Sequence, residues 1–80
     1  MNQYKSIFNM SIGETGIIID METIDKSTRH RFMDLGIAPY AKIKLLNKVN
    51  FNQLYIIEVD DVEICIRQKY ARMIIVQNNN

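Results

Sequence analysis

The sequence predicts a mainly β domain: a small closed barrel of five short strands, with one short α-helix between the first and second strands. Isoleucine and valine together occur 18 times among the 80 residues, whereas alanine and leucine together occur 7 times. Because β-branched side chains lose rotamer freedom in helices and pack well in sheets, this composition favours strands. The apolar segments are short, and one of them has a helical period. Short strands with an isolated helix favour a barrel over a sandwich.

The first strand is expected at residues 16–22, after a turn that contains Gly13 and Gly16. Two glycines this close together indicate a turn that leads into a strand. The alternation along the strand places three apolar side chains on one face, namely Ile17, Ile19 and Met21.

The helix is expected at residues 27–35, where apolar residues recur at helical spacing. Ser27 suits the N-cap, and Gly36 suits the left-handed position at which helices end. Pro39 follows soon afterwards and cannot continue a helix. We therefore expect the helix to end at Gly36.

The second strand is expected at residues 41–46, because charged and apolar residues alternate there. Its outer face carries Lys42 and Lys44. The polar segment 47–53, which contains Phe51, is expected to be a loop.

The third and fourth strands are expected to form a hairpin. It comprises residues 54–59, a turn of Asp60 and Asp61, and residues 62–67. Asp tolerates the left-handed conformation that a two-residue turn needs better than most residues do. This register places Val59 opposite Val62 and Glu58 opposite Glu63.

A single helical turn at residues 68–71 is expected to lead into the last strand, at residues 73–76. Residues 1–76 are therefore interpreted as one domain, since a chain of this length rarely forms two cores. The polar residues 77–80 are expected to form a disordered tail.

The composition excludes several classes of protein. One cysteine and one histidine cannot form a disulfide framework or a cysteine-rich metal site. A net charge of +1 argues against a protein that binds nucleic-acid phosphates. The apolar segments are too short to span a bilayer, and the start of the chain does not resemble a signal peptide, so we expect a cytosolic protein.

No residue pattern indicates an enzyme. Ser27, His30 and Asp34 share one side of the expected helix, but a hydroxyl at an N-cap is occupied by backbone N–H groups. Gly13 and Gly16 lack the lysine and hydroxyl residues of a phosphate-binding loop. We expect neither catalytic residues nor a cofactor.

Metal binding is weakly indicated. His30 lies between Arg29 and Arg31, which is a poor place for a dication, and Cys65 has the pattern of a packing residue. The facing pair Glu58 and Glu63 has two interpretations. Either a lysine on the neighbouring strand, Lys42 or Lys44, compensates the two charges, or the pair weakly holds a divalent cation.

A binding surface is indicated by aromatic residues in loops. Tyr40 and Phe51 are both expected in loops, where exposed apolar side chains often mark a partner surface. Phe51 could instead fold back over the mouth of the barrel. A nucleic-acid patch could be formed by Lys42, Lys44, Lys48, Arg29 and Arg31, with Phe51 and Tyr40 as stacking groups. The near-zero net charge favours a solvated strand face in its place.

Three segments resemble motifs of the FeoA family of bacterial ferrous-iron transport proteins. Ser11–Gly16 resembles the family's opening L-x-x-G-E-x-G, and Arg31–Pro39 resembles its helix exit R-L-x-E-L-G-L-x-P. Ile66–Ala71 and Ile74–Val76 together are similar to its ending L-R-x-x-E-A-x-x-I-x-V. The chain departs from the family pattern at Tyr40, where glycine is usual, at the loop over residues 49–54, and at Tyr70, where glutamate is common.

The resemblance implies an SH3-like barrel and a function. It implies a non-enzymatic, cytosolic accessory or regulatory protein of ferrous iron uptake, which binds the cytosolic GTP-binding part of the FeoB transporter. Five residues are candidates for this contact: Arg29, His30, Met33, Tyr40 and Phe51. Nucleic acid is not an expected partner, and a homo-oligomer stays open.

The alternative is a stand-alone SH3-like domain related to the C-terminal domain of iron-dependent repressors, acting in metal-responsive gene regulation. The sequence lacks a helix-turn-helix segment, so such a domain would not read DNA by itself. Binding to duplex DNA would favour this alternative.

Overall fold

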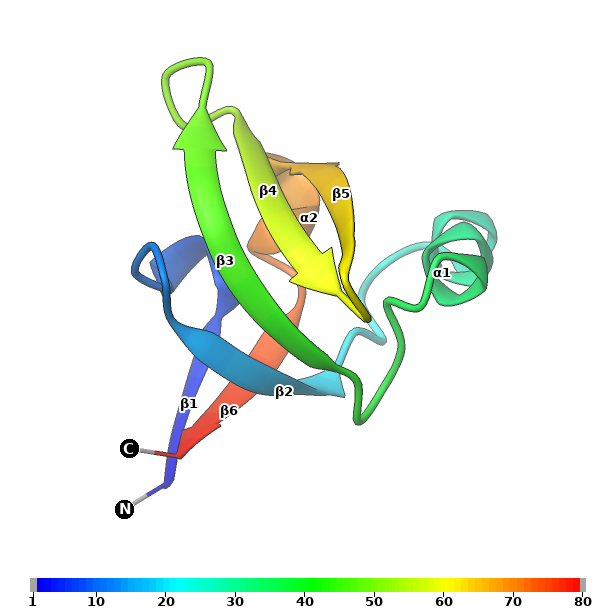
Figure 1. Ribbon diagram of the computed structural model, residues 1–80. Coiled ribbons are helices and arrows are strands. Elements are labelled where there is room, and N and C mark those ends of the chain that lie inside the picture. The colour runs from blue at the N-terminus through cyan, green and yellow to red at the C-terminus, as the bar shows by residue number, and fades with distance from the viewer. Residues whose placement is uncertain (1, 80) are drawn as a thin grey trace.

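A computed structural model describes residues 2–79. One antiparallel sheet contains six strands, in the spatial order β1-β6-β2-β3-β4-β5 (Figure 1). The strands are β1 (Asn2–Ser6), β2 (Thr15–Asp20), β3 (Lys42–Val49), β4 (Leu54–Val59), β5 (Val62–Arg67) and β6 (Ile75–Asn79). The helices are the 3₁₀ turn η1 (Ile7–Asn9), α1 (Lys26–Asp34) and α2 (Gln68–Ala71).

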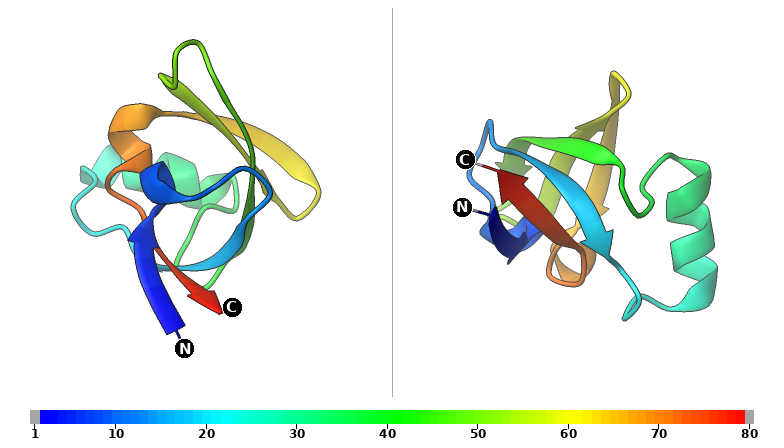
Figure 2. Two further views of the ribbon diagram at one scale, coloured as in Figure 1. Left: turned by 90° about the vertical axis from the view of Figure 1, so that its left-hand side faces the viewer. Right: turned by 90° about the horizontal axis from the view of Figure 1, so that it is seen from below.

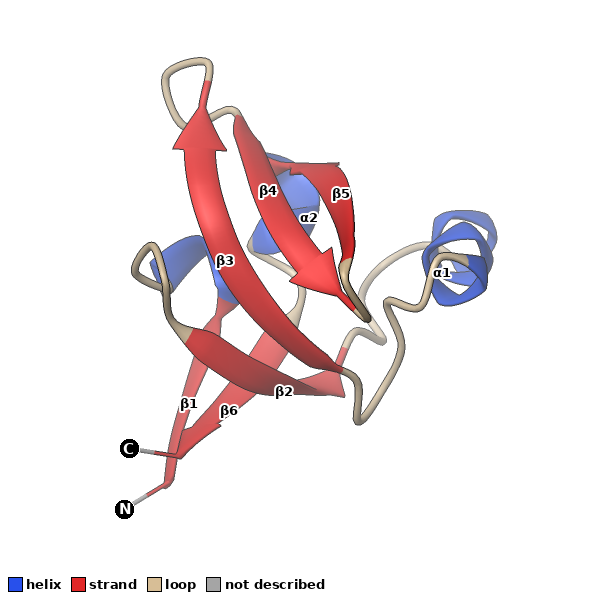
Figure 3. Cartoon of the chain, in the orientation of Figure 1, coloured by secondary structure: helices blue, strands red, loops and turns tan. Residues whose placement is uncertain are grey.

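The sheet curls strongly but keeps two edges. β1 and β5 lie at the ends of the strand order, and α2 lies between them, against β4, β5 and η1 (Figure 3). The expected mainly β fold with a short helix between two strands is confirmed, but the number of five strands is wrong. The expected closure is also wrong, because the hydrogen-bonded order begins at β1 and stops at β5.

The core fills the inside of the curl. Tyr55 is 1% exposed and lies 6.1 Å from Phe8, measured between ring centroids. The other largest buried side chains are Ile7, Met10, Ile18, Met21, Ile24, Ile37, Ile43, Leu45, Ile57, Ile74 and Val76. Burying side chains of this size contributes about 1.5–3 kcal/mol each, so this cluster dominates the stabilisation of the sheet.

The β4–β5 hairpin confirms the sequence prediction. Val59 lies opposite Val62 and Glu58 lies opposite Glu63. Asp60 and Asp61 have φ angles of 50° and 65°, as a type I′ turn requires at both central positions. Asp therefore serves here in the left-handed conformation, in which glycine is more common.

Helix α1 begins earlier than predicted. Asp25 is the N-cap, and its carboxylate accepts hydrogen bonds from the Thr28 N–H and from the Ser27 hydroxyl, each at 3.1 Å. The Thr28 N–H holds the pKa of Asp25 below its ordinary value. The prediction that Ser27 is the N-cap is wrong. The carboxylate of Asp25 takes that role, and its negative charge also complements the helix dipole.

The end of α1 confirms the role of Gly36. Its φ is +95°, and its N–H donates to the Met33 carbonyl at 3.0 Å. The Ile37 N–H donates to the Phe32 carbonyl at 2.9 Å. These two bonds form a Schellman motif, which requires a left-handed residue at the position of Gly36.

The two termini contain more strand than predicted. β1 (Asn2–Ser6) was not expected, and it pairs with β6. β6 continues to Asn79, so residues 77–79 belong to the sheet and are not the expected tail; Asn80 lies outside the described residues. β3 likewise continues to Val49, which shortens the expected loop.

The interior face of β2 also differs from the prediction. Ile18 is fully buried, whereas Ile17 and Ile19 are half-buried. The pairing of β2 with β6 shifts register between Ile18 and Asp20. Ile17 and Ile19 therefore share a face as predicted, but the fully buried Met21 does not share it, because the bulge changes the alternation after them.

A polar cluster joins the start of β2 to the two terminal strands; we call it the Glu14 corner (Lys5, Ser11, Glu14, Asn78). The Glu14 carboxylate accepts from the Ser11 N–H at 2.8 Å and lies 2.9 Å from the Lys5 Nζ. The Asn78 side-chain amide also donates to this carboxylate. Burial by itself would raise the pKa of Glu14, but the Ser11 N–H and the Lys5 ammonium outweigh it and lower that pKa.

Helix α1 stands apart from the curled sheet, on the side of β5 (Figures 1 and 2).

Across residues 2–79, no helix has the length and apolar character needed to cross a membrane.

Candidate functional site

An open cavity of about 320 Å³ lies between α1 and β5. We call it the α1–β5 groove. It is lined by Thr28, Arg31 and Phe32 of α1, by the C-cap Leu35, and by Cys65 and Arg67 of β5. Its volume falls in the range of about 300–1,000 Å³ that is usual for binding pockets.

The wall formed by α1 follows from helical spacing. Thr28, Arg31, Phe32 and Leu35 recur at intervals of three and four, so they share one side of the helix. Phe32 packs edge-on against Tyr70 of α2, with ring centroids 5.3 Å apart, and this contact fixes the position of α1. Leu35 is 54% exposed and gives the groove an apolar side.

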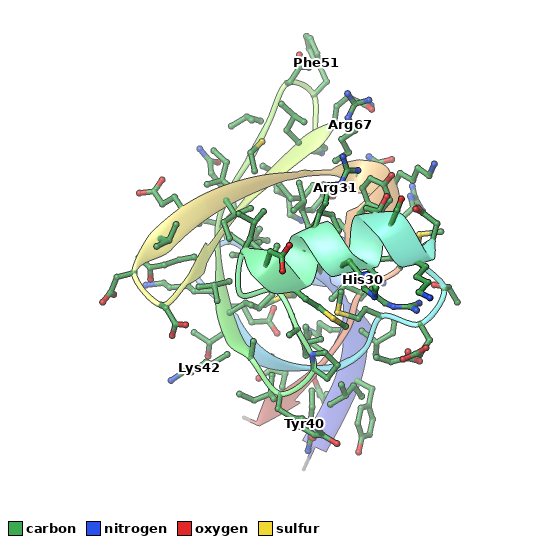
Figure 4. The ribbon with its side chains drawn as sticks, turned by 90° about the vertical axis from the view of Figure 1, so that its right-hand side faces the viewer. His30, Arg31, Tyr40, Lys42, Phe51 and Arg67 are labelled. Atoms are coloured by element: carbon green, nitrogen blue, oxygen red, sulfur yellow. The ribbon has the colours of Figure 1, made fainter. Side chains whose placement is uncertain are left out.

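Two arginines line the α1–β5 groove without a counter-charge. Arg31 comes from α1 and Arg67 from β5, and both lie above the helix in Figure 4. Among the residues that the structure describes, no carboxylate lines the groove. Within residues 2–79 neither guanidinium forms an ion pair, and the Arg31 Nη2 makes a 3.4 Å contact with the Thr28 hydroxyl. An anionic group would therefore find two planar donors here.

The backbone of β5 presents a free edge beside the groove. In a hairpin with a two-residue turn, Val59 and Val62 form a hydrogen-bonded pair, and every second pair along the ladder is hydrogen-bonded. The N–H and C=O groups of Glu63 and Cys65 therefore point away from β4. Nothing in the described part of the chain hydrogen-bonds to them.

A second open cavity, of about 880 Å³, continues this surface towards the β3–β4 loop. Arg67 lines both cavities, and Lys69 and Arg72 add two further cations. Gln68 holds the loop in place, because its backbone N–H donates to the Gln53 carbonyl at 2.8 Å and its side chain donates to the Asn52 carbonyl at 2.9 Å.

Phe51 lies at the tip of the β3–β4 loop and points outward (Figure 4). It is 95% exposed, so the alternative that it folds back over the barrel mouth is wrong. Residues 50–52 all have positive φ, and this run of left-handed residues aims the aromatic ring away from the core.

The five candidate contact residues do not form one surface. Tyr40 is 83% exposed and lies at the opposite end of the molecule from Phe51 (Figure 4). His30 and Met33 are both exposed on α1. In Figure 4, His30 lies between these two extremes.

Arg29, the fifth candidate, is tied to the segment before α1. Its Nη1 donates to the carbonyls of Glu22 and Ile24, at 3.2 and 3.0 Å, and lies 3.8 Å from the Glu22 carboxylate. These contacts give Arg29 a local structural role.

The carboxylates of the hairpin face each other as predicted. Glu58 lies opposite Glu63 on β5 and opposite Lys44 on β3, so a lysine adjoins the pair. Within residues 2–79, no three histidine, cysteine, aspartate or glutamate side chains come together in a way that could hold a metal ion.

The α1–β5 groove itself was missed in the sequence. Arg31 and Arg67 are far apart along the chain and meet through the packing of α1 beside β5. Each arginine belongs to one of the three motifs on which the family resemblance depends. The presence of an arginine in two of those motifs is the sequence signal that could have indicated a shared site.

The curled antiparallel sheet, with one helix packed beside an edge strand, defines a small SH3-like domain. The family model of the FeoA domain matches residues 6–78. The chain therefore belongs to the FeoA family, as the resemblance indicated.

Solved structures share this fold. The FeoA protein from Chlorobium tepidum is 20% identical over 94% of this chain and 70% of its own, with a TM-score of 0.87. The FeoA-like protein from Clostridium acetobutylicum is 18% identical over 100% of this chain and 92% of its own, with a TM-score of 0.82.

A manganese-dependent transcriptional repressor is also similar, at 16% identity and a TM-score of 0.86, over 99% of this chain and 44% of the repressor. This chain thus corresponds to less than half of that protein. No curated protein sequence matches this chain.

Proposed function

We propose that this protein is a non-enzymatic accessory protein of bacterial ferrous iron uptake that binds the cytosolic GTP-binding part of the FeoB transporter. Membership of the FeoA family, small accessory domains associated with iron transport, supports the process. The observation that carries the binding role is the α1–β5 groove, where two arginines without a counter-charge adjoin apolar walls. Such a surface suits a protein partner, because exposed cations steer association and apolar walls stabilise the complex.

The proposal gives the protein no catalytic residue and no resident metal or cofactor. It also places the protein in the cytosol, because the GTP-binding part of the partner is cytosolic. The groove offers guanidinium groups and an exposed thiol but no carboxylate or histidine, so it does not offer the oxygen and imidazole ligands that ferrous iron prefers.

The test is direct binding to the purified GTP-binding domain of FeoB, measured by isothermal titration calorimetry. Binding is expected for the native chain, and the double variant Arg31→Gln/Arg67→Gln is expected to bind about tenfold more weakly, since two charge-assisted contacts are lost. The matched control is Lys42→Gln/Lys44→Gln, which removes the same charge from the outer face of β3. Absence of binding, together with unchanged ferrous iron uptake after gene deletion, would contradict the proposal.

A second candidate is regulation of metal-responsive genes, favoured by the likeness to repressor domains. Within the described residues, α2 has 4 residues and α1 has 9, and neither is followed by a second helix that could enter a DNA groove. Salt-sensitive binding of the isolated chain to duplex DNA would favour this candidate.

A further inference from the structure

We propose that the free edge of β5 and the α1–β5 groove together bind an extended peptide segment of a partner protein. The segment carries a carboxylate towards its N-terminal end and joins the sheet as an additional antiparallel strand. This inference rests on the proposed function for the identity of the partner and adds what the partner presents. Three features of this part of the molecule support it: the unpaired backbone groups of β5, the absence of features that block strand pairing at its edge, and the charged side chains beside it.

The backbone provides the template. The outward N–H and C=O groups of Glu63 and Cys65 have no partner within residues 2–79. An incoming extended strand would satisfy these groups with the same ladder that joins β4 to β5. The adjoining cavity of about 320 Å³ provides room for side chains of that strand.

The edge of β5 lacks lysine, proline and a bulge, three of the features that protect edge strands against such pairing. Natural edge strands are commonly blocked by lysine, proline or a bulge. β5 has the sequence Val-Glu-Ile-Cys-Ile-Arg, which contains neither lysine nor proline, and its pairing with β4 shows no register shift. Helix α1 lies beside the edge but leaves the groove open.

Charge determines the kind of peptide. Arg31 and Arg67 line the groove at the α2 end of β5, whereas Glu63 lies towards the hairpin turn. A carboxylate opposite Arg67 would be bound by both guanidinium groups, and a lysine opposite Glu63 would pair across the strands. Read from N to C in the antiparallel direction, the favoured pattern is Glu-x-Thr-x-Lys, with the central residue opposite Cys65.

The first experiment measures affinity for a peptide of this pattern. A fluorescein-labelled peptide, Thr-Glu-Val-Thr-Val-Lys-Thr with blocked ends, is titrated with the full chain and followed by fluorescence anisotropy. Arg31→Gln/Arg67→Gln is expected to weaken binding about tenfold, and Lys42→Gln/Lys44→Gln is expected to change it less than about twofold. Equal effects of the two double variants would overturn the inference. A two-dimensional NMR spectrum of each variant checks that it is folded.

The second experiment tests the strand geometry with matched peptides. Methylation of the backbone nitrogen of the central Thr removes the bond to the Cys65 carbonyl, whereas methylation of the next Val alters a group that points away from β5. The central methyl group is expected to weaken binding about tenfold and the neighbouring one to have little effect. Equal losses would contradict an added strand.

The third experiment locates the peptide by amide hydrogen exchange. Binding is expected to slow exchange of the Glu63 and Cys65 amides about tenfold or more, because they become hydrogen-bonded. Binding without this protection, or protection at β1 in its place, would overturn the inference.

These experiments separate the inference from the proposed function. If the peptide binds and protects β5 but the FeoB domain does not bind, the inference stands and the proposed function fails. If the FeoB domain binds while the Cys65 amide stays unprotected and Arg31→Gln/Arg67→Gln has no effect, the proposed function stands and the inference fails.

Discussion

Across residues 2–79, the charges of the Glu14 corner are paired, whereas those of the α1–β5 groove are not. Glu14 receives a backbone N–H, an ammonium group and a side-chain amide from three segments. Arg31 and Arg67 line an open cavity without any carboxylate. Both clusters bring together residues that are distant in the sequence, but the first completes its contacts within the chain and the second does not.

This difference predicts that the Glu14 corner stabilises the fold, whereas the α1–β5 groove is available for binding. A partly buried carboxylate with its hydrogen bonds satisfied stabilises the folded state, because unfolding returns it to water without those fixed partners. Exposed guanidinium groups without a partner contribute little to folding and stay free to bind an external anion. Substitutions in the two clusters should therefore have opposite consequences.

The largest expected effect is at the Glu14 corner. Glu14→Gln should lower the free energy of unfolding by about 2 kcal/mol, because the ion pair with Lys5 is lost and an amide cannot accept every bond the carboxylate does. Urea denaturation measures the change. Glu22→Gln is the control, because that carboxylate is 79% exposed and its 3.8 Å pair with Arg29 should contribute about 0–0.5 kcal/mol. Equal effects of the two substitutions would contradict the comparison.

The effect of Glu14 should also depend on pH. Its pKa is lowered from the ordinary value of 4.5, so the unfolded chain binds the proton more tightly than the folded chain does. Its contribution is therefore complete above about pH 4.5 and is lost as the pH falls through the lower folded pKa. Urea midpoints of the native chain and of Glu14→Gln should converge as the pH falls from 7 to 3. A difference that stays constant over this range would show that the charge of Glu14 does not stabilise the fold.

A smaller effect is expected at the end of α1, which forms one wall of the groove. Gly36→Ala should destabilise the protein by about 1 kcal/mol, because φ is +95° and an added Cβ would lie 3.3 Å from the Val59 side chain. Gly13→Ala is the matched control, since Gly13 has φ +92° with no atom within 4 Å of the added Cβ. The difference between the two melting temperatures measures the contact with Val59. A larger loss for Gly13→Ala would contradict this assignment.

The β4–β5 hairpin could be predicted from the sequence because its information is local. The alternation of Tyr55, Ile57 and Val59 marks the buried face, and a two-residue turn fixes the register. The same holds for the end of α1, where a glycine at the left-handed position is a signal carried by one residue.

β1 and the end of β6 could not be predicted, because their stability is not local. Their sequences, Asn-Gln-Tyr-Lys-Ser and Ile-Val-Gln-Asn-Asn, do not show a regular apolar alternation. Asn78 is 3% exposed, and its amide bonds to Glu14, which lies near the other end of the chain. Tertiary pairing overrides weak strand propensity at these positions.

The candidate site was predicted in part. Exposure of Tyr40 was expected from its loop position, whereas exposure of Phe51 was one of two alternatives that the sequence left open. The sequence could not show that the two residues lie at opposite ends of the molecule. The groove depends on α1 packing through Phe32 against Tyr70, a contact between segments with no local signal. The residues of the α1–β5 groove are brought together by packing and not by spacing along the chain.

The smallest expected effect on stability is at the α1–β5 groove. Arg31→Gln/Arg67→Gln should change the free energy of unfolding by less than about 0.5 kcal/mol, because neither side chain has an ion pair among the described residues and both are exposed. The same protein should lose most of its affinity for the Glu-x-Thr-x-Lys peptide. Urea denaturation and fluorescence anisotropy on one preparation measure both quantities. If the double substitution destabilises the fold as much as Glu14→Gln does, the two arginines hold α1 in place. The conclusion that the Glu14 corner stabilises the fold while the α1–β5 groove serves binding would then be wrong.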